Sequence, residues 1–82
     1  MKIDRPPDFY VIGESGGRFP AYLQGQLSAD SRLLVGFTAT TPASPFVIDS
    51  EALCMATFTG TRLDIPVEAA DPPTEVWQLL TR

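Results

Sequence analysis

The feature that most constrains the fold of this sequence is a regular alternation of apolar and polar positions between Arg18 and Ser28. Odd positions are apolar or glycine, and most even positions are polar. A period of two residues is typical of a β-strand with one buried face. The same phase recurs from Leu33 to Ala39, and an apolar run from Phe9 to Ile12 precedes both segments.

The first two segments are separated by Glu14–Gly17, which contains two glycines that tolerate a positive φ. A three-residue loop over Ser15–Gly17 would place Phe9 opposite Leu23. It would place Tyr10 opposite Tyr22 on the other face of the hairpin.

The next loop, Ser28–Arg32, would pair Leu27 with Leu33 and Gly25 with Val35. The inward positions would then all be apolar or glycine, and a slip of one residue would expose the whole set. The chain from Phe9 to Thr40 is therefore predicted to form a three-stranded antiparallel meander.

The second half of the chain is less regular. A break at Thr41–Pro45 precedes a short strand, Phe46–Ile48. The segment from Ala52 to Phe58 fits a helix capped by Ser50, but it also fits a hairpin that turns at Gly60-Thr61. The hairpin, which pairs Ala56 with Ile65, is favoured, and Pro66 would then lie at a sheet edge or a bulge.

The C-terminal segment has two interpretations. Asp71 before Pro72 resembles a helix N-cap followed by proline at the first helical position, and the alternation of Trp77 and Leu79 fits a strand equally well. The sequences Pro6–Val11 and Pro72–Trp77 both begin with a proline pair that leads into an apolar segment. We treat this echo as coincidence.

These patterns predict one small domain over residues 1–82, with residues 1–7 frayed. The fold class is all-β or β-rich α+β: a small antiparallel meander or barrel-like sheet, with or without one short C-terminal helix. A hydrophobic content of 44% in 82 residues is sufficient for a packed core.

Charge and composition exclude several kinds of function. Six basic and ten acidic residues give a net charge of −4, and the deficit lies in residues 41–82. A basic nucleic-acid footprint is absent, so no direct nucleic-acid partner is expected. With no histidine and the single Cys54, which we expect to be a small buried hydrophobe, we expect no metal and no cofactor.

The N-terminal residues lack the apolar region of a signal peptide, and no apolar run is long enough to cross a membrane. We therefore expect a cytoplasmic protein with no membrane partner. Asparagine is absent and Lys2 is the only lysine, whereas arginine, alanine, proline and glycine are plentiful. This bias suggests a GC-rich gene of a bacterium or a bacterial virus, and in the second case the location is the host cytoplasm.

The run Gly13-Glu14-Ser15-Gly16-Gly17 resembles the G-x-S-x-G nucleophile elbow and the sequence around the nucleophile of chymotrypsin-like proteases. A serine nucleophile needs an adjacent base, normally histidine, and this chain has none. The run is therefore interpreted as a hairpin turn. No catalytic residues are predicted, and we expect a protein that is not an enzyme.

The candidate interface residues are aromatic, basic and acidic. Tyr10 and Tyr22 would face outward beside Arg18, a composition typical of protein interfaces. Ile12 and Leu34 would extend this face into an apolar patch, covered either by the segment around Trp77 or by a partner. The predicted acidic rim consists of Asp49, Glu51, Asp64 and Glu68.

These observations favour a small acidic, non-catalytic protein-binding module that inhibits or adapts a larger protein. Its size, acidity and inferred origin look like those of small inhibitors encoded by bacterial viruses, including anti-CRISPR proteins. The alternative is a structural subunit of a homo-oligomer or a phage particle, in which a free edge strand pairs with a second copy.

Overall fold

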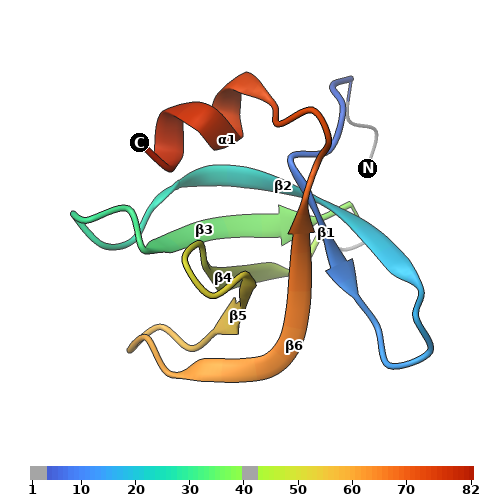
Figure 1. Ribbon diagram of the computed structural model, residues 1–82, viewed down its shortest axis with the longest axis horizontal. Helices are drawn as coiled ribbons and strands as arrows, with labels where there is room; N and C mark the ends of the chain where they lie inside the picture. The colour runs from blue at the N-terminus through green and yellow to red at the C-terminus, as the bar shows by residue number, and fades with distance from the viewer. Residues whose placement is uncertain (1–3, 40–42) are drawn as a thin grey trace.

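In the computed structural model, which describes residues 4–39 and 43–82, six antiparallel strands close into a barrel and one short helix packs against it (Figure 1). The strands pair in chain order, and the last strand pairs with the first. This architecture confirms the predicted fold class. The elements are β1 (Phe9–Ile12), β2 (Arg18–Gln26), β3 (Leu33–Thr38), β4 (Pro45–Asp49), β5 (Cys54–Ala56), β6 (Arg62–Ala69) and α1 (Glu75–Leu80).

The predicted meander is present as β1, β2 and β3, but the register of its first hairpin differs by two residues. Phe9 lies opposite Ala21 rather than Leu23, and Tyr10 lies opposite Pro20 rather than Tyr22. The reason is the loop, in which the Gly13 amide donates to the Gly17 carbonyl at 2.8 Å. A shift of two residues keeps every side chain on its expected face, so Phe9 and Ala21 are still buried.

The second hairpin has the predicted register at Gly25 and Val35, and then a β-bulge between Leu23 and Gly25 changes it by one residue. Such a bulge inserts one extra residue into one strand. Beyond that residue the inward and outward positions of the strand are exchanged relative to its partner. Leu34, which was expected to face outward, is therefore fully buried in the main core. That expectation is wrong because the alternation pattern contains no sign of the bulge.

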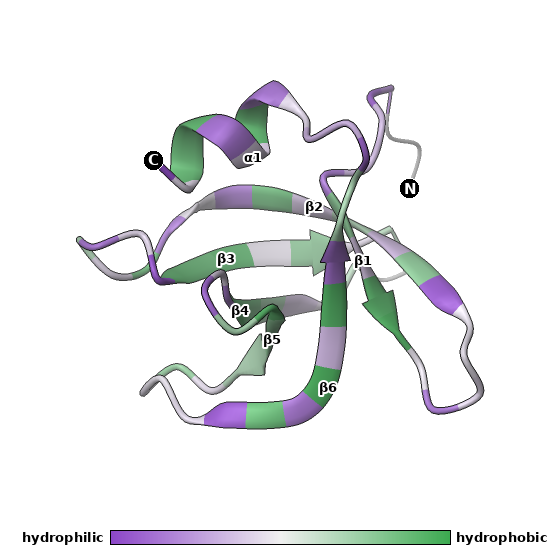
Figure 2. Ribbon diagram, in the orientation of Figure 1, coloured by the Kyte–Doolittle hydropathy of each residue, from purple (hydrophilic) through white to green (hydrophobic). Residues whose placement is uncertain are grey.

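The main core lies inside the barrel and is closed on one side by α1, which contributes Trp77. Phe9 contacts both Trp77, at 6.3 Å between ring centroids, and Phe46, at 5.6 Å. Along β6, apolar and polar residues alternate (Figure 2), and Val67 is the residue of this strand that enters the core. The core residues are Phe9, Ala21, Leu23, Leu34, Ile48, Val67 and Trp77.

The ambiguous segment from Ala52 to Phe58 forms β5 and its hairpin with β6, which confirms the favoured interpretation over a helix. The predicted pairing is wrong, because Ala56 lies opposite Arg62 rather than Ile65. The turn is longer than two residues: the Thr57 amide donates to the Thr61 carbonyl at 3.0 Å. Pro66 lies opposite Cys54, at the irregular part of this ladder, as expected for a bulge.

The C-terminal segment is a helix, although Thr74 rather than Asp71 caps its N-terminus. The predicted strand Phe46–Ile48 is confirmed within β4, whereas part of the predicted break at Thr41–Pro45 falls outside the described residues. Within the described strands the barrel is closed, so the free edge expected for pairing with a second copy is absent.

One corner of the barrel is held together by the carboxylate of Asp49, at the end of β4. Its Oδ2 accepts from Arg32 and from Arg62 Nε at 2.8 Å, and its Oδ1 accepts from the amides of Glu51 and Ala52. Burial of this carboxylate opposes ionisation. The hydrogen bonds from Ala52, Arg62 and Glu51 outweigh burial and lower the pKa of Asp49 from 3.8 to about 2.

We predict that Asp49→Asn lowers the free energy of unfolding at pH 7 by about 2–4 kcal/mol, because it leaves two arginines without their partner. A folded-state pKa below the unfolded one stabilises the fold above pH 3.8, and this contribution is lost as the pH falls toward 2. The difference between the native chain and Asp49→Asn should therefore shrink by about 2 kcal/mol between pH 5 and pH 2. Urea unfolding at several pH values measures this difference in stability, with the exposed Asp64→Asn variant as control. A difference that does not change with pH would contradict the lowered pKa of Asp49.

Gly36 on β3 provides a second test of the packing, because a Cβ atom there would lie 2.5 Å from the Tyr22 carbonyl oxygen. Gly36→Ala should destabilise the barrel by about 1–3 kcal/mol through overpacking. The matched control is Gly25→Ala, where a Cβ atom meets nothing within 4 Å. In thermal unfolding, Gly36→Ala should have a clearly lower melting temperature than Gly25→Ala. Equal melting temperatures would contradict the close approach of β2 and β3 at Gly36.

Candidate binding groove

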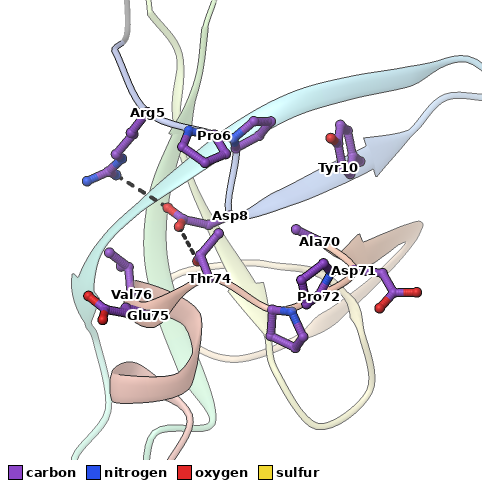
Figure 3. Close-up of a pocket in the computed structure, with 12 residues that line it drawn as sticks. Arg5, Pro6, Asp8, Tyr10, Ala70, Asp71, Pro72, Thr74, Glu75 and Val76 are labelled. Atoms are coloured by element: carbon purple, nitrogen blue, oxygen red, sulfur yellow. Dashed lines mark hydrogen bonds and ion pairs between the residues drawn. The ribbon is translucent and has the colours of Figure 1, made fainter.

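A groove of about 560 Å³ lies between the segment that precedes β1 and the segment that joins β6 to α1 (Figure 3). Prolines form much of both walls: Pro6 and Pro7 on one side, and Pro72 and Pro73 on the other. The closed topology brings these segments together, because β1 and β6 are neighbours at the seam of the barrel. The remaining lining residues are Arg5, Asp8, Tyr10, Ala70, Asp71, Thr74, Glu75 and Val76.

The proline pairs make the walls of the groove rigid before any partner arrives. Proline restricts φ to a narrow range and has no N–H group. The residue that precedes a proline is also restricted to extended conformations. A surface built in this way loses little conformational entropy on binding, which favours affinity.

The Asp8 carboxylate joins the two walls of the groove to the barrel. Its Oδ2 accepts from the Leu23 amide at 2.8 Å and from Arg5 Nη2 at 3.3 Å, and its Oδ1 accepts from the Thr74 hydroxyl. The Asp8 carbonyl accepts from the Ala70 amide at 3.1 Å. Asp8 is almost completely buried, and both of its carboxylate oxygens are already engaged.

Thr74 carries this connection into the helix. Its hydroxyl donates to Asp8 and accepts from the Trp77 amide at 3.2 Å, which caps the first turn of α1. The position of Trp77 over the core and the position of the groove wall therefore depend on the same hydroxyl.

Some of the charged side chains that line the groove are paired within the fold, and others are not. Arg5 is engaged: besides Asp8, its Nη2 donates to the Leu23 carbonyl at 3.0 Å, and its guanidinium lies 5.4 Å from the Tyr22 ring centroid. Arg5 belongs to the segment expected to be frayed, and these contacts hold it against the barrel. By contrast, Asp71 and Glu75 form none of the salt bridges found among the described residues, and their carboxylates lie on opposite sides of the groove (Figure 3).

Three of the predicted interface residues lie together on the outer face of β1, β2 and β6. The Arg18 guanidinium lies 4.3 Å from the ring centroid of Tyr10, and it forms a salt bridge with Glu68 at 3.3 Å. Tyr10 and Glu68 are opposite each other in the ladder between β1 and β6. Tyr10 also lines the groove, so this outer-face cluster of Tyr10, Arg18 and Glu68 is continuous with it.

The other predicted residues are placed differently. Tyr22 is only 6% exposed, because its ring stacks on Phe37 at 5.7 Å and lies under Arg5. Asp49 is 0% exposed, so its expected position on an acidic rim is wrong: two arginines and two backbone amides surround it. Glu51 and Asp64 are exposed, in the turn after β4 and on β6 respectively.

Among the groove residues, sequence reasoning selected Tyr10 and missed the others, although the proline echo lies in the two segments that form the groove. Asp8 and Thr74 each follow a proline pair, and their side chains are hydrogen-bonded to each other across the groove floor. Phe9 and Trp77, further along the two segments, are in ring contact. The echo therefore marks two segments that lie against each other in the folded chain.

Comparisons with known proteins leave the site to be interpreted from its own geometry, since no family model, no curated protein and no solved structure matches this chain.

Ser15 lies in the turn between β1 and β2, as the hairpin interpretation requires. In the described part of the chain, no helix is long and apolar enough to cross a membrane. Over residues 4–39 and 43–82, the acidic and cysteine side chains form no group that could hold a metal ion.

We predict that Thr74→Val lowers the free energy of unfolding by about 1–3 kcal/mol, because it removes the helix cap and one donor to the buried Asp8. The matched variant Thr74→Ser keeps the hydroxyl and should stay within about 0.5 kcal/mol of the native chain. Trp77 is the single tryptophan, so its fluorescence during urea unfolding reports directly on the contact of α1 with the core. Equal loss of stability in the two variants would show that the hydroxyl is not the connecting group.

Proposed function

We propose that this protein is a non-catalytic protein-binding module that inhibits or adapts a larger protein. The observation that carries the proposal is the rigid proline-walled groove, which continues into the outer-face cluster of Tyr10, Arg18 and Glu68. The groove has a volume of about 560 Å³.

The residue types of this surface support recognition of a protein. Tyrosine and arginine are enriched at the energetic centres of interfaces, and here Tyr10 and Arg18 are held in contact with each other. The Asp8 carboxylate, which lines the groove, accepts three hydrogen bonds within the fold. What the groove offers a partner is therefore apolar contact in the centre and charge at the rim.

The composition of the chain supports a narrower version of this proposal. A small acidic protein from a GC-rich gene is what we expect of an inhibitor encoded by a bacterial virus and directed at a host system, as anti-CRISPR proteins are. In this version the partner is a host protein much larger than 82 residues.

A second candidate function is that of a structural subunit in a homo-oligomer or phage particle. It is favoured by large apolar side chains that are exposed outside the groove, among them Phe58 (71%), Leu79 (58%) and Phe19 (52%). Because the described strands have no free edge, copies would associate through these side chains rather than by adding strands.

We predict that filling the groove weakens partner binding. Ala70→Tyr places a ring among the groove-lining residues, whereas the matched control Ala29→Tyr adds the same ring to an exposed loop. With the tagged full chain as bait in a lysate of a GC-rich bacterium, we expect one foreign protein at a fixed ratio. Ala70→Tyr should reduce its capture about tenfold or more, and Ala29→Tyr should leave it unchanged.

Native mass spectrometry of the recovered complexes gives the stoichiometry, and thermal unfolding confirms that both variants are folded. Capture that is insensitive to Ala70→Tyr would contradict the groove as the binding site. Recovery of self-assembled copies alone would favour the structural subunit.

A further inference from the structure

We infer that the groove takes a partner segment in which an apolar side chain is flanked by cationic ones. This inference rests on the proposed function and specifies the chemistry of its partner. It follows from two observations about the charged side chains around the groove. Some are paired within the fold, and the unpaired ones lie at defined positions.

Most arginines of the described chain are engaged with carboxylates. Arg5 is paired with Asp8, Arg18 with Glu68, and both Arg32 and Arg62 with Asp49. Among the described arginines only Arg82 forms no salt bridge, and it lies beyond the end of α1. The cation inside the groove, Arg5, therefore has no free charge to attract an anionic ligand.

The carboxylates around the groove are not balanced in the same way. Asp71 and Glu75 lie on opposite sides of the groove, next to the second proline pair, and neither forms a salt bridge with another residue of the described chain (Figure 3). Both are exposed, and the chain as a whole carries a net charge of −4. These two carboxylates favour a positively charged segment and repel nucleic acid or an acidic peptide.

The centre of the groove requires a different kind of side chain. The prolines of the two walls present apolar surface to the groove, and the Asp8 carboxylate between the walls is already engaged by Arg5, Thr74 and a backbone amide. A cation placed in the centre would lose its hydration without gaining a free acceptor, which is unfavourable. The geometry therefore separates the two requirements: an apolar side chain in the centre and cations at the rim.

The test uses three capped hexapeptides that differ only at their two ends. Each has the central sequence Ala-Leu-Trp-Ala, flanked on both sides by arginine, by glutamine or by glutamate. Amide shifts of the full ¹⁵N-labelled chain at low ionic strength report binding. Because prolines have no N–H, the reporters are the groove amides of Tyr10, Ala70, Asp71, Glu75 and Val76.

We expect the arginine peptide to shift the groove amides, the glutamine peptide to bind about tenfold more weakly, and the glutamate peptide more weakly still. The double variant Asp71→Asn/Glu75→Gln should remove the advantage of arginine over glutamine. The matched control, Glu51→Gln/Asp64→Asn, removes two exposed carboxylates outside the groove and should preserve that advantage.

Each other outcome overturns a defined part of the account. Equal binding of the three peptides at the groove would overturn the inference about charge and leave the groove as a binding site. Shifts confined to amides outside the groove would overturn the assignment of the site. If no peptide shifts the groove amides, the inference fails, and the groove fails as the binding site only if capture of the partner is also insensitive to Ala70→Tyr.

Discussion

The buried carboxylate of Asp8 is the interaction on which the rest of this structure depends. It accepts hydrogen bonds from the Leu23 amide in β2, from Thr74 at the start of α1 and from Arg5 in the N-terminal segment. A buried carboxylate is stable only when donors of this kind compensate for its loss of hydration. Because those donors come from three distant parts of the chain, forming this set of bonds builds the two walls of the groove at the same time.

Asp8 can join the two walls of the groove because the barrel is closed. Pairing of β1 with β6 brings the segment before the first strand next to the segment after the last one, although they are far apart in sequence. The same closure leaves no free strand edge among the described strands, so recognition by added strands is disfavoured and side-chain surfaces become the means of contact. The groove at the barrel seam combines proline walls with the exposed carboxylates of Asp71 and Glu75.

Local patterns in the sequence were sufficient to predict much of this architecture. Alternation over Arg18–Ser28 predicted the strands of the meander, and the glycines before Arg18 predicted its first turn. The β-bulge after Leu23 could not be predicted, because one extra residue leaves no mark in an alternating pattern. Leu34 was consequently placed on the wrong face.

The candidate site was less predictable, because it depends on contacts between distant parts of the chain. Tyr10 and Arg18 were predicted on one outward face and Glu68 on a separate acidic rim, and the closure between β1 and β6 brings all three together. Asp49 looked like an exposed acid, since nothing in the sequence indicates that two arginines converge on it.

The central claim, that one carboxylate assembles the groove, is tested most directly by amide hydrogen exchange in Asp8→Ala. The Leu23 amide loses its acceptor directly, whereas the Ala70 and Trp77 amides keep their own acceptors, the Asp8 carbonyl and the Thr74 hydroxyl. If Asp8 holds the two walls together, protection should fall at all three amides. Loss of protection at Leu23 alone, with Ala70 and Trp77 exchanging as in the native chain, would contradict the account.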